Sequence, residues 1–179
     1  MVIALAGRRV DAPRTKVARF PRENVPRVRS RIFDWFERHD IVTLVCSAAC
    51  GADLLALDAA GELGIRRRIV LPFHREQFRS SSVVDRGGEW GVYYDAILDV
   101  VAARGDVFRL GYTPENKTAY LETNHVILEL AISLGVQLAH PVRVVVVWDG
   151  ESRGNNDVTK AFQEEAYKRG LAVEKISTL

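Results

Sequence analysis

The sequence predicts a single-domain α/β protein, a three-layer sandwich built around a mostly parallel sheet of about six strands. Short β-rich segments alternate with amphipathic helical segments along the whole chain. Residues 142–148 form an apolar run that only Arg143 interrupts, and such a run is typical of a central parallel strand that is covered on both faces. The 179 residues are 47% hydrophobic and 27% charged, enough for one core. No linker, repeat or low-complexity segment divides them, so residues 1–179 are expected to form one domain.

Six short segments carry the strand pattern. They are apolar or rich in β-branched residues, and Gly7 and Pro72 close the first and the third. The expected strands are residues 2–6, 41–46, 68–71, 107–110, 142–148 and 171–176. Their alternation with helices predicts right-handed crossovers between parallel neighbours.

Five segments carry apolar residues at helical spacing. Gly64 and Gly170 follow two of them as C-terminal stops. The expected helices are residues 23–39, 51–63, 89–104, 117–134 and 157–169. Residues 73–88 contain three consecutive serines and a Gly-Gly pair, and they predict a long polar loop, which is often functional.

Composition excludes several classes of protein. Charged residues interrupt every long apolar stretch, so no membrane span is predicted, and no basic leader precedes the first apolar run. Cys46 and Cys50 are too few for a disulfide framework, and a cytoplasmic location is expected. The two cysteines have no second pair, and the four histidines are scattered, so neither a metal site nor a cofactor is predicted.

The net charge of +2 is unevenly distributed. Residues 8–31 hold nine Arg or Lys against Asp11 and Glu23, a local charge of +7, which leaves −5 for the rest of the chain. This asymmetry suggests either an anion-binding edge or a solvated basic helix face.

Ligands of open parallel sheets bind at the carboxyl ends of the strands, near helix N-termini. Small and polar residues follow the first, second and fifth expected strands. The candidate ligand-binding residues in these places are Arg8, Arg9, Ser47, Gly51, Asp53, Asp149, Gly150, Gly154, Asn155, Asp157 and Thr159. Arginine offers a rigid fork of donors to phosphate, which also makes Arg19 a candidate. The alternative is that these segments are tight turns and that Asn156 or Asp157 only caps the following helix.

A polar triplet lies near the start of the longest expected helix. Within it, Asn124 is a candidate ligand-binding residue, and Glu122 is the candidate catalytic carboxylate if it is desolvated. The alternative is a solvated helix start. The phosphate-binding patterns GxGxxG and GxxxxGK[ST] are absent, and so is the hydrolase elbow GxSxG.

Four motifs resemble the SLOG superfamily of Rossmann-like proteins, which includes the Lonely Guy phosphoribohydrolases and the DNA-processing proteins of bacterial transformation. In order along the chain they are residues 47–60 (SAACGADLLALDAA), 69–73 (IVLPF), 124–128 (NHVIL) and 147–162, which contain VWDG and GNNDVTKAF. The resemblance implies a site for a nucleotide or nucleotide derivative. By position, Gly51 and Asp53 match its first turn, Asn124 matches an asparagine in the helix before the central strand, and Gly154, Asp157 and Thr159 match the second turn.

The second turn departs from the phosphoribohydrolase pattern PGGxGTxxE. Asn155 and Asn156 stand where glycines are usual, and no Glu follows Thr159 by three positions. The departure argues against N-glycosidic cleavage by that mechanism and leaves binding without turnover open.

The sequence therefore predicts a protein that binds a nucleotide or nucleotide-derived ligand, either as a sensor or as an N-glycosidic hydrolase or transferase. Two alternatives remain at this point. One is a single-stranded nucleic-acid-binding protein that uses residues 8–31. The other is a non-catalytic interaction module, and self-association into a homo-oligomer is expected of such domains.

Overall fold

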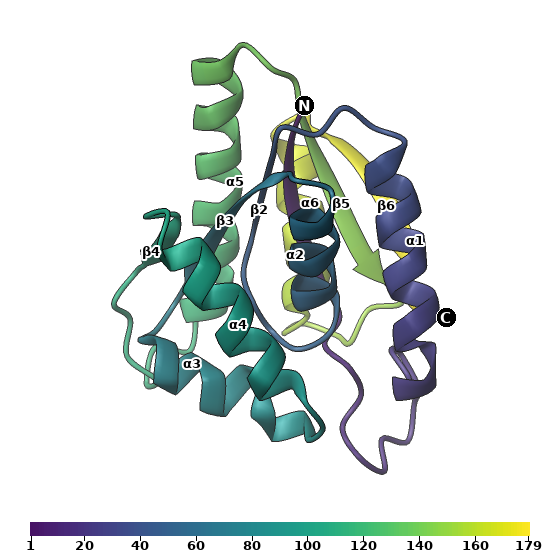
Figure 1. Ribbon diagram of the computed structural model, residues 1–179. Helices are drawn as coiled ribbons and strands as arrows, with labels where there is room; N and C mark the ends of the chain where they lie inside the picture. The colour runs from purple at the N-terminus through teal and green to yellow at the C-terminus, as the bar shows by residue number, and fades with distance from the viewer.

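The computed structural model describes residues 1–179 and contains one six-stranded sheet in which all strands are parallel (Figure 1). The strand order is β4-β3-β2-β1-β5-β6. The strands are β1 (Val2–Gly7), β2 (Thr43–Cys46), β3 (Arg66–Leu71), β4 (Val107–Arg109), β5 (Val142–Trp148) and β6 (Ala172–Ser177). The predicted fold class and strand count are confirmed.

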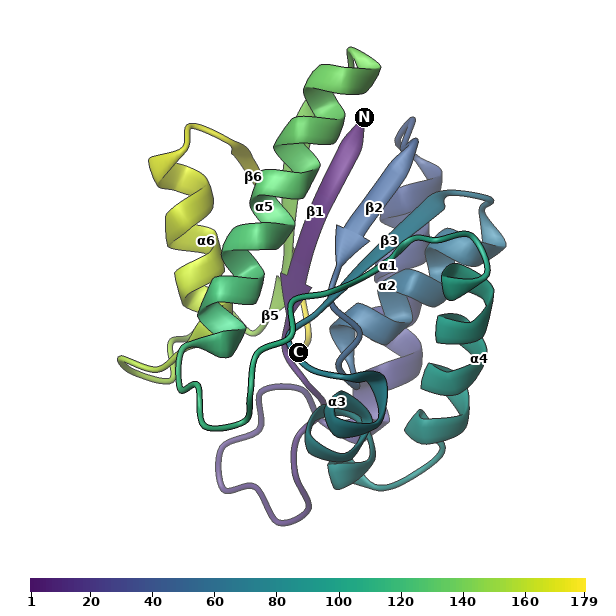
Figure 2. The same ribbon diagram turned by 90° about the vertical axis from the view of Figure 1, so that its left-hand side faces the viewer.

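Helices cover both faces of this sheet and complete the three layers (Figure 2). One face carries α1 (Val25–Glu37), α2 (Ala52–Glu62) and α4 (Trp90–Ala102), and the other carries α5 (Ala119–Leu138) and α6 (Val158–Lys168). Alternation along β1 produces two separate cores. Ile3 and Leu5 pack with the first set of helices, whereas Val2 and Ala4 pack with the second.

The expectation of a loop over residues 73–88 is wrong. This segment contains α3 (Arg75–Ser82) and a short 3-10 helix at Val84–Arg86. Phe78 is buried in the core, and Arg79 pairs with Asp95 of α4. These tertiary contacts stabilise a helix whose serines have only modest helix propensity.

The strand order places a topological switch point beside β1. From β1 the chain moves outward through β2, β3 and β4, and it then returns to place β5 and β6 on the other side. The connection after β1 therefore runs toward β2, and the connection after β5 runs the opposite way, toward β6. The carboxyl ends of β1 and β5 border the crevice between these two connections. No helix combines the length and hydropathy that a membrane span requires.

Candidate functional site

A cavity of about 250 Å³ lies at the carboxyl edge of the sheet, beside the ends of β1 and β5. Its walls come from β1, from the turns that follow β2 and β5, and from α2, α3 and α5. The polar side chains of the lining are those of Arg8, Arg9, Ser47, Asp53, Ser82, Tyr120, Thr123, Asn124, Arg153, Asn156, Asp157 and Thr159. The position is the one at which open parallel sheets bind ligands.

Seven of the thirteen candidate ligand-binding residues line this cavity. They are Arg8, Arg9, Ser47, Asp53, Asn124, Asp157 and Thr159. The turn after β2 and the turn after β5, about 100 residues apart in the sequence, thus face one space.

Six candidates lie outside the lining, namely Arg19, Gly51, Asp149, Gly150, Gly154 and Asn155. Gly51 has a positive φ of 107°, and it forms a β-bridge with Arg9. A Cβ on Gly51 would lie 2.7 Å from both the Arg8 carbonyl oxygen and the Val10 amide nitrogen. Gly51 therefore permits close packing of two backbone segments rather than contact with a ligand.

We expect Gly51→Ala to lower the free energy of unfolding by about 2–3 kcal/mol, because it adds backbone strain and a clash with two backbone atoms. Gly64→Ala is the matched control. Gly64 also has a positive φ, but nothing lies within 4 Å of an added Cβ, so about 1 kcal/mol is expected. Urea unfolding of both variants measures the difference, and equal losses would contradict the packing role of Gly51.

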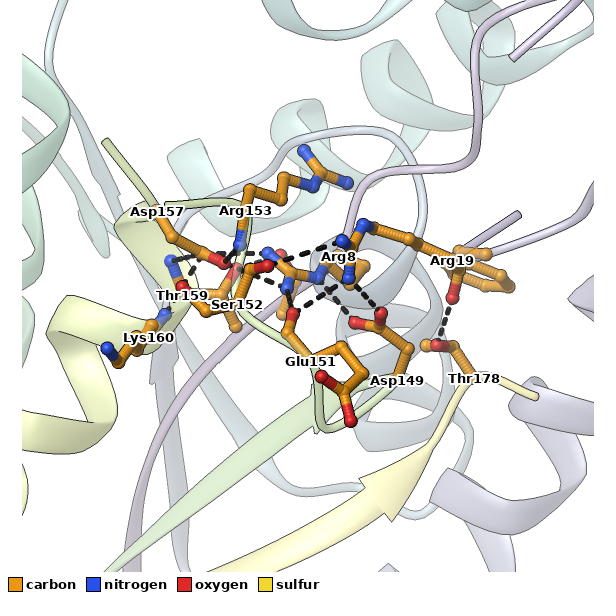
Figure 3. A network of polar contacts seen from close by, with 12 residues as sticks. Arg8, Arg19, Asp149, Glu151, Ser152, Arg153, Asp157, Thr159, Lys160 and Thr178 are labelled. Atoms are coloured by element: carbon orange, nitrogen blue, oxygen red, sulfur yellow. Dashed lines mark hydrogen bonds and ion pairs between the residues drawn. The ribbon is translucent and has the colours of Figure 1, made fainter. Parts of the chain in front are cut away.

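Arg8 is the most deeply buried cation of the site, at 2% exposure, and it is enclosed by two aspartates (Figure 3). Its Nε donates to Asp149 at 2.9 Å, and its Nη1 and Nη2 donate to Asp157 at 2.7 and 2.9 Å. Nη2 also donates to the Glu151 carbonyl, and Arg19 donates to the second oxygen of Asp149. At most one of the five N–H groups of Arg8 is left for a ligand, so Arg8 mainly holds the turn after β5 against β1.

Asp157 is the N-cap of α6, as the alternative interpretation of this turn predicts. It accepts hydrogen bonds from the backbone N–H groups of Thr159 and Lys160 through one oxygen and from that of Arg153 through the other. Burial alone would raise its pKa, but the hydrogen bonds from Arg8 and these amides outweigh burial and lower the pKa of Asp157 to about 2. Asp157 is therefore an ionised anchor.

Asp53 is the other aspartate in the cavity. Unlike Asp157, it has no arginine partner and few hydrogen bonds to stabilise its charge. Its side chain is 7% exposed, Oδ2 accepts a hydrogen bond from the Ala49 N–H, and Oδ1 has no hydrogen-bond partner in the protein. Burial raises the pKa of Asp53 to about 7, although the Ala49 amide and the charge of Arg9 offset part of that effect. A cavity carboxyl with a pKa near neutrality both accepts and donates protons at physiological pH.

Glu122 is not among the residues that line the cavity. Its carboxylate accepts hydrogen bonds from Thr118 and Asn116 at the start of α5. The hydrogen bond from Thr118 is the main cause that lowers the pKa of Glu122. The condition for its proposed catalytic role, desolvation, is not met, and the solvated helix start describes it better.

Asn124, two residues further along α5, does face the cavity. Its Nδ2 donates to the Val158 carbonyl at 2.9 Å, which ties α5 to the start of α6. Its side-chain oxygen has no hydrogen-bond partner in the protein and is available to a donor on a ligand.

Apart from Asn124, sequence reasoning did not assign the residues of α3 and α5 to the walls of the cavity. Ser82 and Tyr120 share a hydrogen bond of 2.8 Å, and Phe78 and Ile127 supply apolar wall. The helical period of α5 identified Ile127 as apolar, but no local signal shows that this end of the helix reaches the carboxyl edge.

The basic residues of segment 8–31 are divided among several regions. Arg8 and Arg9 belong to the cavity, whereas Arg29 on α1 pairs with Asp58 and Glu62, and Arg31 donates to carbonyls at the C-terminus. Arg29 and Arg31 therefore have partners other than those of the cavity arginines. No three His, Cys, Asp or Glu side chains come together as a possible metal site.

The fold and the site define the class of this protein. It is an all-parallel α/β sandwich with a polar cavity at the topological switch point of its sheet. No protein-family model and no curated protein matches the chain. Among solved structures, DNA processing protein A (DprA) from Streptococcus pneumoniae is similar, with 12% identity and a TM-score of 0.40. The alignment covers 98% of this chain and 58% of that protein.

Proposed function

We propose that this protein binds a nucleotide or nucleotide-derived ligand in the cavity beside β1 and β5. One observation carries the proposal. Polar side chains from the segment after β1, from α2 and α5, and from the turn after β5 converge on a single space at the topological switch point, where α/β proteins bind such ligands.

The size of the cavity restricts the part of the ligand that enters it. Its volume of about 250 Å³ is below the roughly 300–1,000 Å³ of pockets that enclose drug-sized ligands. One nucleoside is therefore the largest unit that we place inside, with any phosphates at the mouth.

The lining supplies complementary groups for a nucleoside. The free oxygens of Asp53 and Asn124 are suited to accept hydrogen bonds from ribose hydroxyls or from amino groups of a base. Phe78 and Ile127 offer apolar wall to the base. This assignment makes Asp53 the principal polar contact of the ligand.

Isothermal titration calorimetry against nucleosides and nucleotides of all common bases tests the proposal. We expect one class to bind, and we expect Ser47→Leu to abolish binding because the larger side chain fills half-buried cavity space. Ser80→Leu, on the exposed side of α3, is the matched control and should bind normally. Failure of every nucleoside and nucleotide to bind the wild-type protein would reject the proposal.

Turnover at the N-glycosidic bond is a second candidate function, and Asp53 is the observation that favours it. Cleavage through an oxocarbenium-like transition state needs a carboxyl group that transfers a proton or stabilises the sugar. Asp53 has the required exposure to the cavity and a pKa of about 7.

Chromatography of nucleotide incubations distinguishes an enzyme from a sensor. If base is released, we expect Asp53→Asn to reduce the rate by about 100-fold or more and Glu122→Ala to leave it unchanged. Release that depends on Glu122 and not on Asp53 would overturn this assignment.

A further inference from the structure

Two open hollows continue from the mouth of the cavity along the carboxyl edge. The first, of about 370 Å³, shares Arg153 with the cavity, and the second, of about 560 Å³, shares Arg86 with the first. Both are walled by the segment that follows β1, which Figure 2 shows extending beyond the strand end beside α3. We name Arg9, Arg86 and Arg153, together with Arg14 and Arg22 in the second hollow, the arginine rim.

Positive charge on the rim exceeds the negative charge available to neutralise it. Arg9 and Arg86 share a single carboxylate, that of Asp85. Arg153 has no ion pair, and Figure 3 shows its guanidinium pointing away from the network around Arg8. Arg14 also has no ion pair, and Arg22 donates only to the Arg86 carbonyl.

Asp11 and Glu23 in the walls of the hollows join Asp85, so five arginines face three carboxylates and the rim keeps a formal excess of two positive charges. Asp11 accepts the backbone N–H groups of Arg19 and Phe20, Asp149 is held by Arg8 and Arg19, and Glu23 remains as the one further acid in the walls.

Two of the rim arginines also have unused donors. The Nε atoms of Arg9 and Arg86 are buried and make no hydrogen bond in the protein, and Arg86 Nε lies 3.4 Å from Asp85 without forming one. Burial and the nearby charges of Arg8 and Arg19 lower the pKa of Arg153. Uncompensated guanidinium groups of this kind are suited to the oxygens of phosphate.

We propose that the arginine rim binds the β- and γ-phosphates of a nucleoside di- or triphosphate whose nucleoside occupies the cavity. This inference rests on the proposed function and specifies its ligand. The cavity has room for one nucleoside, so the phosphates must lie outside it. Arg9 lines the cavity, and Arg153 lines both the cavity and the first hollow.

A polyphosphate fits the rim better than a nucleic-acid strand does. Proteins that bind single strands combine a basic groove with aromatic side chains on which successive bases stack. The residues that wall the two hollows include no Phe, Tyr or Trp. The rim therefore offers contacts to phosphate and no platform for further bases.

Calorimetry with a nucleoside and its mono-, di- and triphosphate tests the inference. We expect the affinity for the triphosphate to exceed that for the monophosphate by about tenfold or more. The double variant Arg22→Gln/Arg86→Gln changes two rim residues that line the hollows and not the cavity, so it should lose this gain and retain the affinity for the nucleoside. Arg104→Gln, exposed between α4 and β4 at the opposite edge of the sheet, is the matched control and should change neither.

The outcomes separate this inference from the proposed function. Equal affinity for mono- and triphosphate, or a gain that persists in a correctly folded double variant, overturns the role of the rim alone. Tighter binding of a single-stranded oligonucleotide than of the triphosphate overturns it as well. Absence of binding by every nucleoside and nucleotide rejects the proposed function itself.

Discussion

Asp157→Ala is expected to lower the free energy of unfolding by about 3–5 kcal/mol, the largest loss from any single substitution at this site. The substitution leaves the guanidinium of Arg8, which is 2% exposed, with Asp149 as its only carboxylate partner. It also leaves the backbone N–H groups of Thr159 and Lys160 at the start of α6 without their acceptor. Loss of an N-cap alone costs about 1 kcal/mol.

Chemical denaturation measures this loss, with Asp58→Ala as the matched control. Asp58 pairs with Arg29 on the surface of α1 and α2, and about 1 kcal/mol or less is expected there. Similar losses in the two variants would contradict the structural role of the Arg8 network.

The contribution of Asp157 has a defined dependence on pH. Its folded pKa of about 2 lies below its ordinary value of 3.8, so the folded state favours the ionised form. Its stabilisation is therefore present above about pH 4 and is lost as the pH falls toward 2. Asp157→Ala should lack this acid-induced loss.

Asp53→Asn is expected to raise the free energy of unfolding, whereas Asp157→Ala lowers it. At pH 8 the expected gain in stability is about 3–4 kcal/mol. The folded pKa of Asp53, about 7, lies above its ordinary value of 3.8, so folding favours the protonated form. The stability of the wild type relative to the variant therefore falls as the pH rises from about 4 to about 7 and is constant above that. Asparagine keeps an oxygen for the Ala49 N–H and carries no charge to bury.

Unfolding curves of the wild type and Asp53→Asn at several pH values test this prediction. The difference in the free energy of unfolding between the two proteins should be small at pH 4 and largest above pH 7. The neighbouring Arg8, Arg9 and Asp157 remain charged over this range, so Asp53 is the titrating group of the cavity. A difference that does not vary with pH would show that Asp53 is ionised throughout.

The same titration has a consequence for the proposed ligand. A hydroxyl of the ligand donates to the ionised carboxylate, so nucleotide affinity should rise as the pH increases through 7 in the wild type. In Asp53→Asn the affinity should not depend on pH in this range. This behaviour separates a contact with the ligand from a purely structural role of Asp53.

Much of the fold could be predicted because it depends on local patterns. The apolar run at residues 142–148 is β5, an interior strand that pairs with β1 and β6 but lies next to the edge of the sheet rather than at its centre. The small residues after β2 mark a turn at the carboxyl edge. Helix α3 could not be predicted, because its stability comes from the burial of Phe78 and from ion pairs with α4 rather than from its own serines.

The sequence by itself determined the alternation of strands and helices, and with it the edge at which the turns after β1, β2 and β5 meet, because a parallel α/β topology brings those ends together. Only the tertiary structure decided the state of each charged group there. Arg8 is enclosed by Asp149 and Asp157, Glu122 lies outside the cavity, and Asp53 loses its hydration. The partners and the solvation of a charge depend on segments far away in the chain, and hydrophobic periodicity carries no information about them.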